Sequence, residues 1–345
     1  MRELNSPTRR QFLRNSVVMA AGAATVPLVG GCGEQQSITR TTCRTTSGGG
    51  KRPAWPIACR DAHLREIGQP DFWTAMTAIG ADRVEVLVKL DLSCEYLMDG
   101  EAKYSLADAN SIRTLGQRFK NANKRIVAFC LSNDFDNRPD EEVACTVKVA
   151  EAAAELGVPA VRLDFVPRQL RDSEDEFLKL SVTLARRIIE QTKGSNICFG
   201  VENHGGTTNK IEFLRKFFAE VGSDRFGLTM DTGNFYWFGY PLSQLYDIYA
   251  EFAPVTFHTH CKSIAYPETE REKRRQTGWE YGKYCSPVYE GDIDFARVTS
   301  LLRRAGYRGS LCIENESLGR VDAAERAGIL AREVQHLRAA AAETA

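Results

Sequence analysis

The amino-acid sequence predicts an α/β fold, a (β/α)8 barrel. Eight short, apolar, β-prone runs alternate with eight helix-like segments over roughly 290 residues, which is the spacing typical of that fold. Four of the later runs end abruptly in a carboxylate or an imidazole, which would be costly to bury without partners. With 345 residues and 43% hydrophobic content, the chain is long enough to build one large core or two smaller ones.

The expected strands are short apolar runs, as buried strands usually are. In chain order they are Trp55–Arg60, Asp82–Val88, Arg125–Leu131, Ala160–Phe165, Ile197–Glu202, Gly227–Asp231, Val255–His260 and Ser310–Glu314.

The expected helices lie between these runs and carry apolar residues at helical spacing, with capping or breaking residues at their ends. They are Asp71–Ile79, Ser105–Asn121, Asp140–Leu156, Ser173–Lys193, Asn209–Val221, Leu242–Phe252, Asp294–Gly306 and Asp322–Ala342. A doubly wound open sheet is the alternative. It would not need eight regular units, and no Gly-x-Gly-x-x-Gly turn follows the first strand.

Residues 1–32 are predicted to be an export signal. Thr8-Arg-Arg-Gln-Phe-Leu-Arg14 resembles the twin-arginine motif, and the apolar stretch Ser16–Val29 is too short and too weakly apolar for a comfortable membrane span. Val29-Gly-Gly-Cys32 resembles a lipobox, so Cys32 is the candidate lipidation site; ordinary signal-peptidase cleavage nearby is the alternative. We therefore expect the twin-arginine export machinery as a partner, a location in the periplasm or cell envelope, and membrane contact only through a lipid anchor.

The remaining chain divides into a flexible tether, residues 33–50, rich in Gln, Ser, Thr and Gly, and a barrel, residues 51–345. The ten cysteines contain no Cys-x-x-Cys pair, so neither a zinc–thiolate site nor a specific disulfide is predicted. The formal net charge is zero, which argues against a nucleic-acid partner because such proteins usually carry basic excess.

The polar strand ends predict a metal site. Glu202 and Asp231 are 29 residues apart, as are Asp231 and His260, and 54 residues separate His260 from Glu314. One βα unit takes roughly 25 to 35 residues, so these are consecutive strands with one long insertion, and their C-terminal ends meet in one mouth. Three carboxylates there would repel one another without a cation. With one imidazole they suit Mn, Mg or Co, and Zn as well. Ion-paired polar ends at a barrel rim are the alternative.

Neighbouring polar residues are candidates for substrate binding. His204 follows Glu202 by two residues and shares its face of the strand, with a purely structural role as the alternative. His258 and His260 also share a face; His260 lies nearer the strand end, and His258 is expected in a second layer or in the core if it does not contact substrate. Lys262 is expected to stabilise negative charge on the substrate, or to be a solvent-facing rim residue. Asn234 completes this group.

These motifs together resemble the xylose-isomerase-like TIM-barrel superfamily, most closely its sugar phosphate isomerase/epimerase branch. The resemblance covers about residues 55–338 and is carried by the segments Val201–Gly206, Met230–Asn234, His258–Lys262, Gly291–Asp294 and Gly306–Glu314. It implies that Glu202, Asp231, His260 and Glu314 are the metal ligands. Ser263 departs from the pattern, because the family usually has Asp after His-x-Lys.

The expected activity is isomerisation or epimerisation of a sugar or keto-sugar through a metal-bound enediolate. One divalent ion (Mn, Co, Mg or Zn) would polarise the carbonyl, and Glu202 and Glu314 would remove and return the proton from opposite faces. The alternatives are a metal-dependent lyase or dehydratase acting on oxidised sugars or inositols, and a non-catalytic exported carbohydrate-binding protein. An apurinic-site endonuclease would need about three metals and many histidines. The chain has only five histidines, which argues against that activity. A homo-oligomer is compatible with the sequence.

Overall fold

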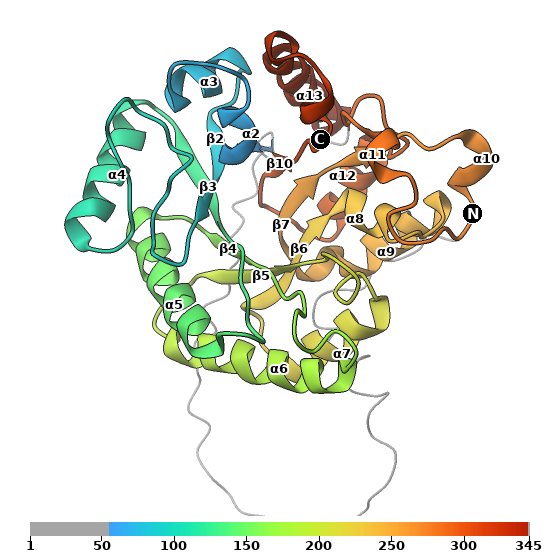
Figure 1. Ribbon diagram of the computed structural model, residues 1–345, viewed down its shortest axis with the longest axis horizontal. Helices are drawn as coiled ribbons and strands as arrows, with labels where there is room; N and C mark the ends of the chain where they lie inside the picture. The colour runs from blue at the N-terminus through green and yellow to red at the C-terminus, as the bar shows by residue number, and fades with distance from the viewer. Residues whose placement is uncertain (1–54, 344–345) are drawn as a thin grey trace, which may run out of the picture.

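The computed structural model describes residues 55–343, which form a closed barrel of parallel strands (Figure 1). The strand order around the ring is β1-β10-β7-β6-β5-β4-β3-β2, so β1 closes the ring between β2 and β10. The predicted (β/α)8 barrel is therefore confirmed, and the open sheet is excluded. The twin-arginine motif, the lipobox with Cys32 and the tether all lie outside the described residues.

Each of the eight predicted strands is present, and each end lies within two residues of its predicted position. The strands are β1 (Ile57–Arg60), β2 (Arg83–Val88), β3 (Arg125–Leu131), β4 (Ala160–Leu163), β5 (Cys198–Glu202), β6 (Phe226–Asp231), β7 (Thr256–Cys261) and β10 (Leu311–Ile313).

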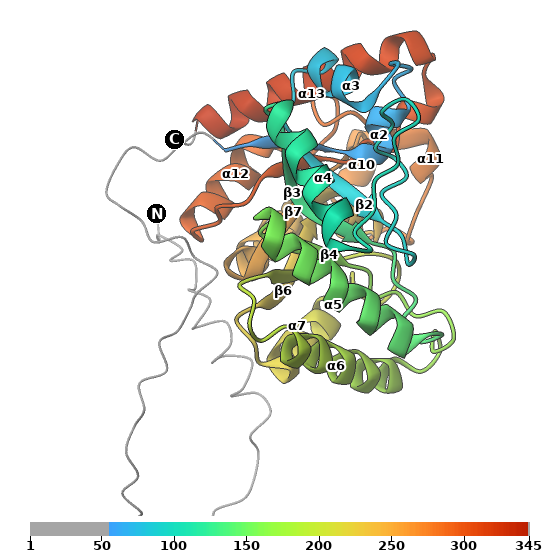
Figure 2. The same ribbon diagram turned by 90° about the vertical axis from the view of Figure 1, so that its left-hand side faces the viewer.

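The eight predicted helices surround the strand ring (Figures 1 and 2). They are α3 (Phe72–Ala78), α4 (Ala109–Asn121), α5 (Pro139–Leu156), α6 (Glu174–Gln191), α7 (Ile211–Val221), α9 (Leu242–Phe252), α12 (Phe295–Arg304) and α13 (Ala323–Glu343). The predicted start of α4 at Ser105 was wrong. The Asp108 carboxylate accepts hydrogen bonds from the N–H groups of Asn110 and Ser111, both at 2.9 Å, and so caps the helix there.

Several short elements were not predicted. Helix α2 (Asp61–Arg65) follows β1 directly, and α8 (Thr232–Trp237) follows β6 directly. The long insertion after β7 contains β8 (Ser263–Ile264), α10 (Glu268–Arg271), α11 (Tyr281–Tyr284) and β9 (Cys285–Ser286), and β8 pairs antiparallel with β9. Two 3₁₀ turns complete the structure, η1 (Ala253–Val255) and η2 (Leu318–Arg320). Helices this short leave too few residues for a periodic sequence signal.

Aromatic side chains fill the layer between the strands and the helices. Phe165 stacks on Phe135 with ring centroids 4.3 Å apart and meets Phe217 edge to face at 5.1 Å. Each fully buried side chain of this kind contributes about 1.5–3 kcal/mol. Gly227 allows β6 and the chain before β7 to approach closely, since a Cβ there would lie 2.1 Å from the Val255 carbonyl oxygen.

Within residues 55–343, no helix combines the length and apolar character that a membrane span requires. Seven cysteines in this part of the chain are free and buried, as small apolar core residues commonly are. Cys198 on β5 differs from them, because it is disulfide-bonded.

Candidate metal centre

Four predicted ligands converge at the C-terminal mouth of the barrel. Glu202 ends β5, Asp231 ends β6, His260 lies near the end of β7, and Glu314 follows β10 directly. The strand register places Asp231 and Cys312 on either side of His260, so the neighbouring ends lie at one level. One ligand atom from each of the four residues lies within 4.8 Å of the others, and all four residues are buried.

Two carboxylate oxygens in this cluster accept no hydrogen bond from the described residues: Asp231 Oδ2 and Glu314 Oε2. The other oxygen of Asp231, Oδ1, accepts a hydrogen bond of 2.7 Å from the Asn234 N–H and so caps helix α8. The cap fixes the Asp231 carboxylate, and Oδ2 is left 4.0 Å from His260 Nδ1. Three converging carboxylates and one imidazole suit a divalent cation, so these residues fit the ion that the family implies.

Positive side chains surround the same carboxylates. Arg162 on β4 donates from Nε to Glu202 Oε2 at 2.6 Å, and Arg60 on β1 donates to Glu314. Lys262 Nζ lies 2.8 Å from Glu314 Oε2 and 3.2 Å from Asp231 Oδ2. These contacts offset much of the repulsion that buried carboxylates would otherwise suffer.

The two arginines and Glu85 on β2 were missed by sequence reasoning. Glu85 and Arg162 interrupt apolar strand runs, and Arg60 is the last residue of β1. A charged residue inside a buried strand requires a charged or hydrogen-bonding partner. That signal was present in the sequence, but it did not say which partner each residue would meet.

The environment shifts the pKa values of Glu202 and Asp231, at the ends of β5 and β6, in opposite directions. Burial alone would raise the pKa of Glu202, but the Arg162 guanidinium and His260 outweigh it and hold that pKa well below its ordinary value. Burial does raise the pKa of Asp231, although the Lys262 ammonium acts against it. Of these two carboxylates, Glu202 is therefore the one that stays ionised more readily.

Asn234 and Lys262 contact the carboxylate cluster directly. Asn234 Nδ2 donates to Glu202 Oε1 at 3.1 Å, and its Oδ1 accepts from Lys262 Nζ at 3.2 Å. Lys262 Nζ also donates to Glu316 Oε1 at 3.1 Å, and the Tyr281 hydroxyl donates to the other oxygen of Glu316. Lys262 is buried, so the alternative of a solvent-facing rim lysine is wrong.

His204 lies at the mouth with 47% of its side chain exposed. Its Nδ1 is 2.9 Å from Asp164 Oδ1, so a carboxylate holds the ring, and a contact with substrate stays a prediction. His258 is only 1% exposed, and its Nε2 lies 2.7 Å from Glu85 Oε2. The structure thus places His258 inside the barrel, in agreement with the alternative of a second-layer or core residue.

The residue that departs from the family pattern, Ser263, is buried and packs against the chain after β9. A Cβ on Gly291 would lie 2.0 Å from Ser263 Oγ, and the same oxygen accepts a hydrogen bond from the Ile293 N–H at 3.3 Å. The absence of a side chain on Gly291 permits this close approach. Within the described residues, the Ser263 hydroxyl forms no hydrogen bond with the four candidate ligands.

The aromatic residues of the long insertion pack mainly on one another. Trp279 stacks on Tyr284 with ring centroids 5.7 Å apart, and both rings contact Tyr266. Tyr281 is the member that reaches the cluster, through Glu316.

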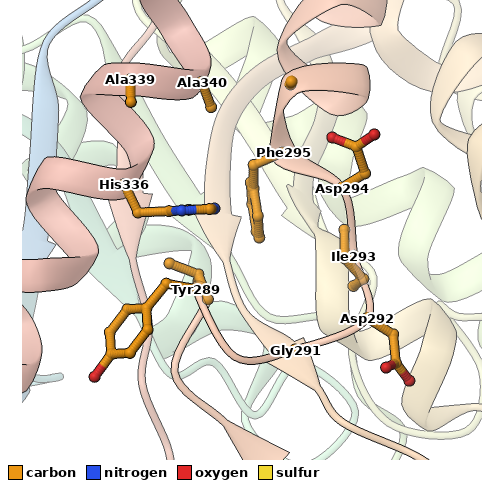
Figure 3. A pocket seen from close by; sticks show the side chains of 11 residues that line it. Tyr289, Gly291, Asp292, Ile293, Asp294, Phe295, His336, Ala339 and Ala340 are labelled. Carbon is orange, nitrogen blue, oxygen red and sulfur yellow. The ribbon is translucent and has the colours of Figure 1, made fainter.

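Two cavities lie apart from the cluster. One of about 410 Å³ lies between α12 and α13, where His336, Phe295 and Asp294 line it (Figure 3). Another of about 490 Å³ lies where β2 and β3 end, beside Arg138 and Glu142 at the start of α5. None of the four candidate ligands lines either cavity.

Comparison with solved structures shows the same fold at low identity. A 3-keto-D-glucoside 4-epimerase from E. coli matches with a TM-score of 0.57 and 16% identity, over 83% of this chain and 99% of its own. The IOLI protein with a binding zinc atom matches with a TM-score of 0.61 and 17% identity, over 82% and 98%. A xylose isomerase-like TIM barrel protein from Mycobacterium smegmatis in complex with magnesium matches with a TM-score of 0.58 and 15% identity, over 83% and 97%.

No curated protein matches the chain. The model of the family described as xylose isomerase-like TIM barrel matches residues 74–340, which is most of the chain. This match and the closed parallel barrel agree, and the chain belongs to the xylose isomerase-like TIM barrel family.

Proposed function

We propose that this protein is a metal-dependent isomerase or epimerase acting on a sugar or keto-sugar. The observation that carries the proposal is the buried set of four ligand atoms, all within 4.8 Å of one another, at the mouth of the barrel. Three carboxylates and one imidazole are a donor set for one divalent ion. The family relationship and the epimerase among the similar structures support the same class of reaction.

The bound ion would polarise a substrate carbonyl and so acidify the neighbouring carbon. The chain's own residues would then move the proton. Glu202 ends β5 and Glu314 follows β10, and these strands are separated in the ring by β6 and β7, so the two carboxylates approach the centre from different sides. One takes a proton and the other returns it, and return on the opposite face inverts the stereocentre. Lys262, buried beside Glu314, supplies positive charge near the developing oxyanion.

A metal-dependent lyase or dehydratase is the second candidate, because the same proton removal can be followed by loss of a β-substituent. His204 favours it. The imidazole is half exposed at the mouth and hydrogen-bonded to Asp164, so it can present a ring nitrogen to a departing oxygen.

The first test is metal content by mass spectrometry on the purified full-length protein. Wild type should carry about one Mn, Co, Mg or Zn ion per chain, and Asp231→Ala should lose it because Oδ2 is removed from the cluster. Asp140→Ala, which removes an exposed carboxylate on α5, should retain the ion. Absence of metal from wild type after incubation with each ion would refute the proposal and favour a carbohydrate-binding surface.

The second test separates the reaction types. Wild type incubated in D2O with free sugars and keto-sugars should incorporate deuterium at carbon, and Glu314→Gln should abolish turnover. Retained activity in that variant contradicts the two-carboxylate scheme. Loss of water from the substrate, measured by mass spectrometry, would establish the lyase, and His204→Ala should then slow that step selectively.

Export remains a separate proposal, since its signals fall outside the described residues. We infer a periplasmic or envelope location with Cys32 as the lipid attachment site. Replacing Arg9 and Arg10 with Lys should retain the protein in the cytoplasm, and Cys32→Ser should release it from membranes, both measured by fractionation.

A further inference from the structure

A buried carboxylate, Glu85, lies on the opposite side of His260 from the candidate metal ligands. Glu85 is the third residue of β2, and both it and His260 have no exposed surface. In the ring, β10 and β1 separate β7 from β2, so the Glu85 side chain reaches across the barrel interior. Nothing in the metal centre described above explains why a carboxylate is buried there.

The two nitrogens of the His260 ring face different groups. Nε2 lies 2.8 Å from Glu85 Oε2, while Nδ1 lies 3.2 Å from Glu202 Oε1 and 3.5 Å from Glu314 Oε2. A metal needs a nitrogen lone pair, and a carboxylate needs an N–H. Nδ1 is the nitrogen directed at the candidate ligands, so Nε2 is the one that donates to Glu85.

Two further side chains fix the Glu85 carboxylate. His258, two residues before His260 on the same strand face, has its Nε2 2.7 Å from the same Oε2 atom. Arg60 Nε lies 2.9 Å from Oε1 and also pairs with Glu314 through its terminal nitrogen. Glu85 is thus ion-paired with an arginine through Oε1, which accepts no hydrogen bond from the described residues, and lies at hydrogen-bonding distance from two imidazoles through Oε2.

We propose that Glu85 is a positioning residue for the metal site: it accepts the Nε2–H of His260, fixes the ring orientation, and directs the Nδ1 lone pair at the ion. Carboxylates that hold the second nitrogen of a ligating histidine commonly raise metal affinity. His258 and Arg60 act one step further away, by holding Glu85. This inference rests on the metal site proposed above.

The alternative is a second metal site, because Glu85, His258 and His260 also bring three ligand atoms within 4.8 Å of one another. The hydrogen-bonded arrangement is favoured because both Nε2 atoms lie at hydrogen-bonding distance from Oε2 of Glu85. The Arg60 guanidinium, 2.9 Å from Oε1, also places a positive charge where a second cation would bind. The stoichiometry of bound metal distinguishes the two.

The test is Zn²⁺ binding to the full-length protein by titration calorimetry, for wild type, Glu85→Gln and a matched control. The control is Glu142→Gln, which alters a buried carboxylate that accepts hydrogen bonds from Asn133 Nδ2 and the Asp134 N–H. We expect one Zn²⁺ per wild-type chain, a Kd weakened by about 10- to 100-fold in Glu85→Gln, and an unchanged Kd in Glu142→Gln. Circular dichroism checks that each variant is folded.

A second measurement needs no Glu85 variant. In zinc-loaded wild type with ¹⁵N-labelled histidine, the His260 signals, assigned by their loss in His260→Asn, should show Nδ1 as the ligand and Nε2 carrying a proton. A protonated Nδ1, or zinc on Nε2, would overturn the inference even if Glu85→Gln fails to fold.

The outcomes separate this inference from the proposed function. Equal zinc affinity in wild type and folded Glu85→Gln overturns only the positioning role. Two zinc ions per chain, with one lost in Glu85→Gln, overturns it in favour of the second site. No zinc binding by wild type overturns this inference. The metal-dependent function is overturned as well only if wild type binds none of Mn, Co, Mg and Zn.

Discussion

Strands β5, β6, β7 and β10 differ in their charged residues from strands β1, β2 and β4. The first group brings Glu202, Asp231, His260 and Glu314 to the mouth, at or just after strand ends. The second group carries Arg60 and Arg162, which pair with Glu314 and Glu202, and Glu85, which meets His260. One side of the barrel therefore supplies candidate ligands, and the other holds them in place.

This difference shows how a barrel can keep several carboxylates together before any ion arrives. Charges buried in pairs cost little net free energy, whereas a buried charge left without its partner costs several kcal/mol. The supporting strands should thus matter most for the stability of the metal-free protein, and the ligand strands for metal binding. Substitutions of Arg162 and Lys262 test this division, and a substitution of Asp61 tests the cost of burying a carboxylate beside the supporting strand β1.

The largest effect is expected from Arg162→Met. It removes the guanidinium that donates to Glu202 and leaves that buried carboxylate without its main counter-charge. The metal-free protein should lose about 3–5 kcal/mol of unfolding free energy in urea denaturation. Added metal should recover part of the loss, because it supplies the missing positive charge.

The matched control is Arg187→Met, whose guanidinium pairs with Asp140 at 2.7 Å on the surface. Exposed pairs are worth about 0–1 kcal/mol, so this change should be nearly neutral. A similar small loss for Arg162→Met would show that the supporting strands do not stabilise the carboxylates.

The second effect concerns Asp61, a buried carboxylate directly after β1. Burial raises its pKa from 3.8 to about 7. Two groups act against this shift: the Leu87 N–H, which donates a hydrogen bond of 2.9 Å to Asp61 Oδ2, and the charge of Arg60. Between these two values the folded chain keeps a proton that the unfolded chain has released. The stabilising contribution is complete below about pH 3.8 and is lost as the pH rises through about 7.

Asp61→Asn should remove the part of the pH dependence of stability that Asp61 causes. Relative to the variant, wild type should lose about 1.4 kcal/mol of unfolding free energy for each pH unit inside that window, measured by urea denaturation at several pH values. Asp82→Asn, which changes an exposed carboxylate paired with Arg83, should keep the wild-type slope. If the unfolding free energy of wild type and of Asp61→Asn changed in parallel with pH, the raised pKa of Asp61 would be contradicted.

The smallest effect is expected from Lys262→Met. The ammonium lies close to both carboxylate oxygens that accept no hydrogen bond, so it competes with a divalent ion for them. Removing it should tighten metal binding about tenfold, by calorimetry, while turnover falls because a charge near the substrate is lost. The control is Lys193→Met, which changes an exposed lysine and should alter neither metal affinity nor turnover. Weaker metal binding in Lys262→Met would show that the lysine orients the ligands.

The sequence was most informative where polar residues stood at strand ends. Spacing and strand alternation predicted the barrel, its eight strands and eight helices, and which four residues would meet. Spacing and alternation could not predict that Arg60, Glu85 and Arg162 would contact the candidate ligands. These contacts join strands far apart in the chain and form only when the ring closes. Helix α8 was also missed, since its start depends on a cap from Asp231 that only the folded end of β6 provides.

That same cap has a thermodynamic consequence. One oxygen of Asp231 closes the first turn of α8 while the other faces the candidate ion, so a single carboxylate takes part in two equilibria. Formation of the helix turn pre-orients the oxygen for the cation, and by reciprocity cation binding must favour the turn by the same free energy. Asn234, on that turn, donates to Glu202. Local folding of α8 and cation binding at the candidate site would therefore be linked.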